Sequence, residues 1–298
     1  MQPVRHASTD TTRLNVSAGL ASAGVALVLV VLKVWAFQAT GALSIGATLA
    51  DSAMDLIMSL GALAAIVYAA RPPDEDHAFG HSSAEDLAAL GQAAIITVAA
   101  GLIAWGAVTR LLAPGPSRLA AEGAGIAVMA VSLALTLALV LWQTRVARRT
   151  GNRVVAADRL HYLADLLPGL GAIAALWASR AWGVGWVDSA VALVAAAVLL
   201  RGAGRIGKGA WDALMDRRAD PALVNGIERI VAGWPGVRGY HDLRTRTAGS
   251  RVFVSVHIEL DGDQSLTEAH AISAALRRAI IDTHPAAEVI IHKDVAAD

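Results

Sequence analysis

Long apolar stretches, separated by short polar connectors, occupy most of the chain up to about Gly207. A helix needs about 20 predominantly apolar residues to cross a lipid bilayer. The stretches are Leu14–Leu32, Leu43–Tyr68, Leu87–Thr109, Gly123–Thr144, Val154–Trp177 and the shorter Val184–Leu200. The pattern therefore predicts an α-helical membrane protein with six transmembrane helices within residues 13–207, preceded by an N-terminal tail of residues 1–12.

The pattern changes after Gly207, where no apolar run is long enough to cross a bilayer. Strict alternation of apolar and polar positions indicates strands, whereas apolar positions three and four residues apart indicate helices. The predicted elements are a helix from Asp220-Pro221, strands at Val237–Thr245 and Val252–Leu260, a helix from Ser265 to about Thr283, and a strand at Glu288–His292. The order α-β-β-α-β predicts that residues 208–298 form a small α+β domain. The basic residues that follow the sixth span predict that this domain is cytoplasmic.

Composition agrees with a membrane protein and excludes several other classes. The 298 residues are 55% hydrophobic and only 17% charged, whereas a soluble domain carries about 25% charged residues. The 25 basic and 25 acidic residues cancel, which argues against a nucleic-acid partner. The absence of cysteine excludes disulfides and thiolate catalysis. Arginines in the connectors after the fourth and sixth spans predict that both termini are cytoplasmic.

Two predicted spans carry ionisable pairs at helical spacing. Asp51 and Asp55 are four residues apart, as are His161 and Asp165, so each pair lies on one face of its helix. A carboxylate at this depth is costly and persists when it is paired, hydrated or bound to a cation. If the two helices face each other, the four side chains form an oxygen and nitrogen site that suits tetrahedral zinc. The alternative is a structural polar cluster. Asp158 is either an outer-shell residue or a solvated acid at a helix start.

Two further groups combine histidines with acids outside the spans. The connector after the second span contains Asp74, His77 and His81, which could bind a transition metal or simply form a polar loop. In the C-terminal domain, His257 lies opposite the apolar row of its strand, and His292 and Asp294 point the same way from the last strand. Histidines that converge on one sheet face favour a metal site, although solvent-facing histidines are common.

Motifs along nearly the whole chain, from about Arg13 to Asp294, resemble one known family. The matching stretches are Gly41–Ile45, Leu49–Asp55, His77–His81 with Ala84–Leu90, Ala157–Tyr162 with Asp165, Trp234–Val237, His241–Arg246 and Val289–His292. In this order they are similar to the cation diffusion facilitators, in particular the bacterial YiiP-type zinc and iron efflux proteins. Six spans followed by a metallochaperone-like domain is the architecture of that family.

The resemblance implies a role for each matching residue. The implied sites are a membrane transport site of Asp51, Asp55, His161 and Asp165, a loop metal site of Asp74, His77 and His81, and a two-metal site of His241, His257, His270, His292 and Asp294 near the dimer contact. It also implies a homodimer in the bacterial inner membrane that exchanges a divalent metal for protons by alternating access. The mixed aspartate and histidine site is similar to that of zinc and cadmium transporters, and Zn²⁺ is then both cargo and structural ion.

The chain departs from the family pattern at two positions. Ser83 stands where related chains carry a lysine that pairs with the counterpart of Asp216, so the dimer hinge must be held differently. Lys293 stands where a neutral amide is usual, and a cation near a metal site weakens binding unless its head points to solvent.

Two other function classes fit parts of the sequence. A membrane-anchored metal sensor or scaffold would need no charges deep in the membrane. A membrane enzyme would need a catalytic arrangement, and the sequence shows no Ser/His/Asp set, HExxH motif or phosphate loop. We therefore expect a transporter rather than an enzyme, exporting zinc, with cadmium and ferrous iron as further candidate cargo.

Overall fold

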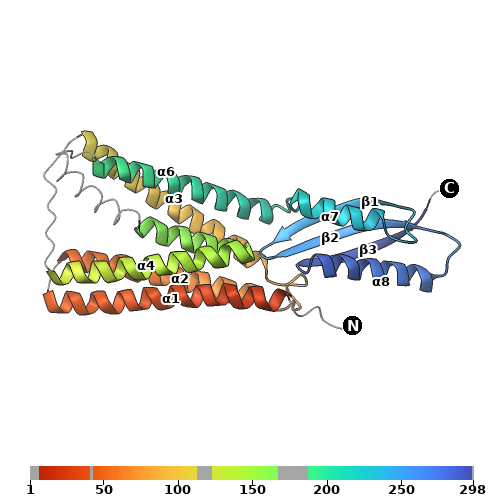
Figure 1. Cartoon of the computed structure of the whole chain (residues 1–298), viewed down its shortest axis with the longest axis horizontal. Helices are drawn as coiled ribbons and strands as arrows, with labels where there is room; N and C mark the ends of the chain where they lie inside the picture. The colour runs from red at the N-terminus through yellow and green to blue at the C-terminus, as the bar shows by residue number, and fades with distance from the viewer. Residues whose placement is uncertain (1–6, 41–42, 113–122, 167–186, 297–298) are drawn as a thin grey trace. The chain divides into compact units, whose positions relative to one another are not determined.

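The computed structural model describes residues 7–40, 43–112, 123–166 and 187–296 (Figure 1). The chain divides into two compact units. The helical unit is Arg13–Trp211, and the C-terminal unit is Asp212–Asp298 together with Met1–Thr12. Each unit has its own buried apolar clusters.

The helical unit contains a helix at each of the six predicted spans. They are α1 (Ala7–Thr40), α2 (Leu43–Ala69), α3 (Ser83–Leu112), α4 (Gly123–Thr150), a helix over residues 153–166, and α6 (Val187–Leu214). Within the described residues, four helices are long and apolar enough to cross a membrane: Asp10–Ala36, Asp51–Ala69, Ser83–Thr109 and Ala130–Thr150. The predicted fifth span continues beyond residue 166, and the sixth begins before residue 187, so both lie partly outside the described residues.

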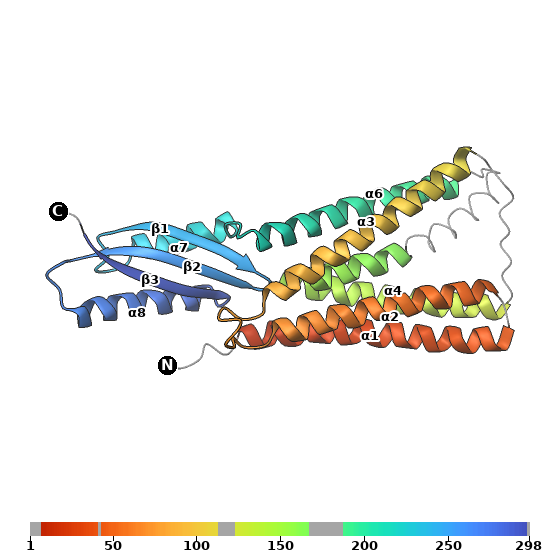
Figure 2. The ribbon, with the colours of Figure 1, turned by 180° about the vertical axis from the view of Figure 1, so that it is seen from behind.

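Small side chains let these helices pack closely. In Figures 1 and 2, α1, α2 and α4 form one group and α3 and α6 another, with the helix over residues 153–166 between them. That helix contacts α3 and α6 through a cluster that includes Leu160, Ala164 and Leu199. A Cβ atom at Gly202 of α6 would lie 2.8 Å from Cδ2 of Leu160. The glycine therefore permits the close contact between α6 and this helix.

The helix over residues 153–166 begins directly after a short turn that ends α4. Gly151 ends α4 with a left-handed φ of +67°, a conformation that costs glycine little. The Asn152 side chain then accepts a 3.0 Å hydrogen bond from the backbone N–H of Val155, as an N-cap does. This turn positions His161 and Asp165 along the new helix.

The C-terminal unit has the α+β order predicted from the sequence. Its elements are α7 (Pro221–Ala232), β1 (Gly239–Ala248), β2 (Arg251–Leu260), α8 (Leu266–Thr283) and β3 (Ala287–Val295). The sheet order is β1-β2-β3, with β1 antiparallel and β3 parallel to β2. As predicted, Asp220 caps the start of α7 and proline is its first residue, and Ser265 and Glu268 form the capping box of α8.

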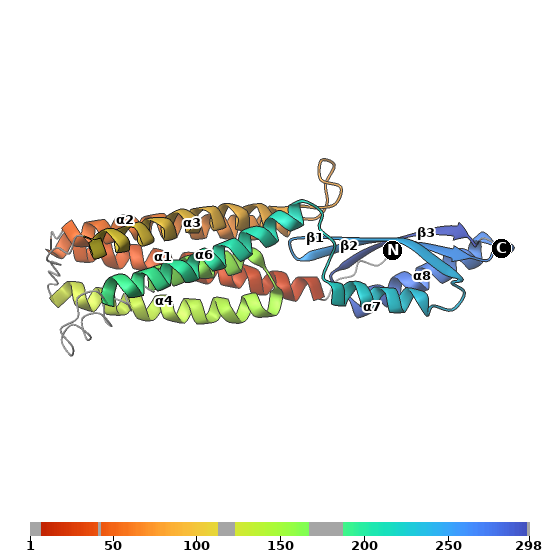
Figure 3. The same cartoon turned by 90° about the horizontal axis from the view of Figure 1, so that it is seen from above.

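One face of this sheet is covered by the two helices. Figure 3 shows α7 and α8 on the same side of the three strands. The alternate residues of β2 from Val252 to Leu260 are buried against that side, in a cluster with Ile227 of α7 and Leu276 of α8. The intervening residues of β2, including His257, therefore point to the uncovered face.

Candidate metal centres

The structure brings together three of the four predicted membrane ligands. Nε2 of His161 lies 3.1 Å from Oδ1 of Asp55 on α2. One ligand atom each from Asp55, His161 and Asp165 falls within a 4.8 Å group. Asp51 is exposed one helical turn before Asp55 and does not belong to this group. Two carboxylates and one imidazole can hold a divalent cation and leave a further position for Asp51 or water.

Lys33 of α1 lies beside this group and was not recognised as part of it from the sequence. Its Nζ donates a 2.6 Å hydrogen bond to Oγ of Ser52, which is fully buried on α2. It also interacts electrostatically with Asp55, Asp51 and Asp165. The signal in the sequence was a single cation at the end of an otherwise uncharged apolar run. A cation here offsets part of the negative charge of the carboxylates.

A buried polar network adjoins the membrane group. Asp158 is only 2% exposed, and its Oδ2 accepts a 2.7 Å hydrogen bond from Nε2 of Gln143 on α4. Tyr162 makes a 2.7 Å hydroxyl contact with Ser59 of α2. The interpretation of Asp158 as a solvated helix-start acid was therefore wrong, because packing of α4 against the following helix covers the side chain.

The loop after α2 gathers the three predicted ligands of its own site. The two carboxylate oxygens of Asp74 lie 3.2 Å from Nδ1 of His77 and 3.1 Å from Nε2 of His81. Gly80, with φ of +81°, lets the chain turn between the two histidines. The backbone N–H of His77 donates to Asp74 and lowers the pKa of that carboxyl, so it is charged at neutral pH. The loop thus presents one anionic oxygen and two nitrogen donors.

The third group lies on the uncovered face of the C-terminal sheet. The strand register places His241, His257 and His292 side by side on β1, β2 and β3. Asp294 contacts all three rings, at 3.2 Å from His241, 2.9 Å from His257 and 3.2 Å from His292. The hydrogen bond from His257 lowers the pKa of the Asp294 carboxyl. Ligand atoms of His241, His257 and Asp294 fall within 4.8 Å of one another, a donor set that suits zinc.

Two predicted features of this region lie elsewhere. His270 is exposed on α8 and does not belong to the described group. Lys293 pairs in register with the buried Ile258, and strand alternation directs it away from His292 and Asp294. Its charge is therefore on the opposite face of β3 from the cluster.

Asp216 has an ion-pair partner within its own unit. This is the acid whose counterpart in related chains pairs with a lysine at the position of Ser83. Oδ1 of Asp216 lies 3.2 Å from a guanidinium nitrogen of Arg246. The charge of Asp216 is thus balanced inside the C-terminal unit.

Comparisons with known proteins cover both units. A family model described as cation efflux transmembrane domain matches residues 19–215, and one described as cation efflux protein, cytoplasmic domain, matches residues 219–295. The cation-efflux pump FieF of Cronobacter sakazakii is 39% identical over 285 residues, covering 96% of this chain and 94% of that protein. FieF of Klebsiella pneumoniae is 38% identical over 284 residues, covering 95% and 93%.

Among solved structures, the metal-bound C-terminal domain of the CzcD transporter from Thermotoga maritima is 26% identical. The match covers 26% of this chain and 91% of the CzcD domain, with a TM-score of 0.25. The two family models and the near-full-length relatives decide the assignment: this chain belongs to the cation diffusion facilitator family, as a membrane-spanning efflux transporter of divalent metals with a cytoplasmic dimerisation domain.

Proposed function

We propose that this protein exports zinc and chemically similar divalent cations from the cytoplasm in exchange for protons, by alternating access. The observation that carries the proposal is the group of Asp55, His161 and Asp165 on two membrane helices. Carboxylates and an imidazole in a spanning segment are costly to keep there, and ionisable side chains at such positions mark ion pathways. The mixed oxygen and nitrogen donors favour zinc over manganese or magnesium, which prefer oxygen ligands alone.

Proton exchange follows from the chemistry of these ligands. Metal and protons compete for the same lone pairs on imidazole and carboxylate, so proton binding promotes release of the metal. An imidazole titrates close to neutral pH, where a cellular proton gradient operates. A site whose occupant alternates between metal and protons limits the negative charge that it exposes to the bilayer.

We further propose the remaining assignments as one scheme. Asp51 completes the transport site from the same face of α2. The loop group of Asp74, His77 and His81 and the C-terminal group around Asp294 bind zinc as structural ions, and His270 contributes near the dimer contact. The protein is a homodimer in the bacterial inner membrane with both termini in the cytoplasm, and it catalyses no chemical reaction.

The decisive experiment is metal flux into proteoliposomes. Replacing Asp165 with Asn removes one charge from the membrane group with little change in size, and we expect zinc flux to fall at least about tenfold. Asp76→Asn is the matched control, because Asp76 is an exposed loop acid outside the three described groups. Full flux in Asp165→Asn would refute the transport site. Zinc binding without any flux in the wild type would favour a metal sensor instead.

A further inference from the structure

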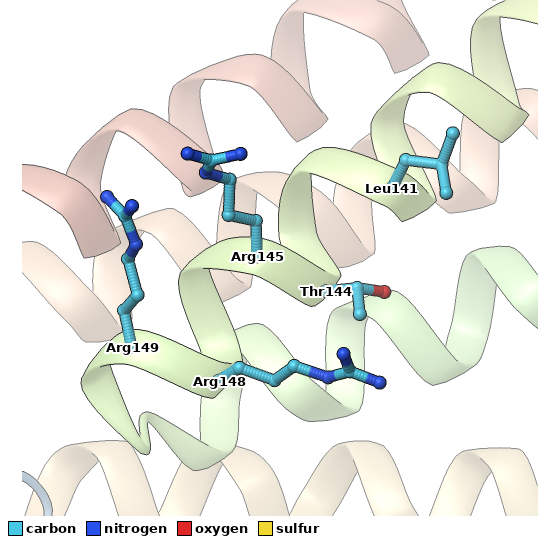
Figure 4. Close-up of a pocket in the computed structure, with 5 residues that line it drawn as sticks. All are labelled: Leu141, Thr144, Arg145, Arg148 and Arg149. Atoms are coloured by element: carbon cyan, nitrogen blue, oxygen red, sulfur yellow. The ribbon is translucent and has the colours of Figure 1, made fainter.

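Three arginines at the end of α4 line one groove, and a fourth, Arg159 of the next helix, lies near one of them. Arg145, Arg148 and Arg149 lie in the last two turns of α4, and Arg159 follows in the helix over residues 153–166. The first three line one groove together with Leu141 and Thr144 (Figure 4). The groove has a volume of about 380 Å³. Within the described residues, none of the four arginines has an acidic partner.

The arrangement of these positive charges favours the binding of an anion. Arg148 and Arg159 are close enough to repel each other. Nε of Arg159 is buried and has no hydrogen-bond partner in the described part of the chain. The dipole of α4 favours cations at its last turn and accounts for Arg148 and Arg149 on their own. It does not satisfy a buried N–H on the following helix, and such a group is costly to leave unpaired.

The apolar side of the groove indicates where the anion comes from. Leu137 and Leu141 are 45% and 63% exposed. Because they are four residues apart and Arg145 follows four residues later, all three lie on one face of α4. On a membrane-spanning helix these leucines contact acyl chains. An apolar surface that adjoins guanidinium groups is complementary to a molecule in which hydrocarbon chains adjoin a phosphate.

We propose that this groove is a binding site for an anionic phospholipid. Its phosphate is held by the guanidinium groups of α4, with Arg159 adding its charge near Arg148, and its acyl chains lie along Leu137 and Leu141. Guanidinium binds phosphate through paired hydrogen bonds, which a zwitterionic headgroup weakens because it brings its own cation. The site requires only that α4 spans a membrane, and it is independent of which metal is carried.

The test measures lipid binding to the full-length protein in detergent by native mass spectrometry. Phosphatidylglycerol is compared with phosphatidylcholine that has the same acyl chains. We expect phosphatidylglycerol to bind at least about tenfold more tightly, and the double variant Arg148→Gln with Arg149→Gln to remove most of that preference. Arg13→Gln is the control, because it removes an exposed arginine from α1, outside the groove.

A second variant separates the binding site from general surface charge. Arg159→Gln removes the buried N–H and leaves the three groove arginines in place, and we expect it to lower phosphatidylglycerol affinity several-fold. Equal binding of the two lipids, or an undiminished preference in both the double variant and Arg159→Gln, would overturn the proposal. Competition by inorganic phosphate at the same concentration as the lipid would also overturn it, because the ligand would then be a soluble anion. Thermal unfolding of each variant verifies that it is folded.

Discussion

The zinc dependence of the C-terminal unit can be tested quantitatively through His257. This side chain is the central member of the histidine row and contacts Asp294 at 2.9 Å. Replacing it with Ala removes a proposed ligand from the middle strand, and the ring is not part of the buried core. Changing a residue that only hydrogen-bonds to a metal ligand lowers metal affinity about 10–100-fold. Because His257 is itself a proposed ligand, we expect about 100-fold weaker zinc binding in His257→Ala.

The expected size of the effect follows from mass action. With free zinc at 100 times the wild-type Kd, binding to the folded state stabilises the wild-type unit by about 2.7 kcal/mol. For a domain of about 90 residues this corresponds to a rise in Tm of about 10–20 °C. A variant that binds 100-fold more weakly gains about 0.4 kcal/mol under the same conditions, or about 2–3 °C.

The assay is thermal unfolding of the isolated segment from Lys208 to Asp298, with and without zinc, at fixed protein concentration. Ser255→Ala is the matched control, because Ser255 lies on the same strand and the same uncovered face, two residues before His257. Its zinc-induced shift should equal that of the wild type. A wild-type Tm that does not depend on zinc, or an equal shift in His257→Ala, would refute the proposed site. Analytical ultracentrifugation of the same samples should show tighter dimers with zinc.

Three further predictions concern other parts of the chain. His161→Asp should weaken discrimination against manganese and move the pH dependence of flux to lower values, because the only imidazole in the membrane group is gone; competitive zinc and manganese flux across a pH series would contradict this if neither quantity changed. Gly202→Val should lower stability by about 1–3 kcal/mol in detergent unfolding, because its Cβ would meet Leu160 at 2.8 Å, whereas Gly204→Val should be tolerated, since nothing lies within 4 Å of that position. Hydrogen bonds from Ser265 lower the pKa of Glu268, so the contribution of this carboxylate to stability is present above the ordinary pKa of 4.5 and is lost as the pH falls below it. In the C-terminal segment, Glu268→Gln should therefore reduce the fall in Tm at acid pH. A fall in Tm equal to that of the wild type would argue against the linkage.

The sequence predicted well those features that depend on local spacing. The apolar runs located the helices, and the strand alternation located β2 and its histidine face, because both patterns reflect geometry within a few residues. The capping box at Ser265 was readable for the same reason. The pairing of Asp55 with His161 was less accessible, since nothing in either helix alone says which other helix it faces.

The misjudged residues are those whose environment is made by distant segments. Asp158 could not be placed as buried until α4 packed over it through Gln143. Lys33 shows as a cation in an apolar run, but its contact with Ser52 depends on the rotation of α1 against α2. Lys293 is different: the period of two along β3 already directs it away from Asp294, and the strand pattern alone could have resolved it.

The row of histidines crosses every strand of the C-terminal sheet, and this has a consequence for how the unit unfolds. β1 and β3 are its two edge strands, and His241 and His292 are separated by most of the sequence between α7 and the end of the chain. An ion shared between these strands would act as a crosslink that closes a long loop in the folded unit, and it would have to dissociate before the chain could unfold completely. Neither edge strand could then peel away without breaking a coordination bond. The lifetime of the folded unit under mechanical load would therefore depend on the exchange rate of the ion.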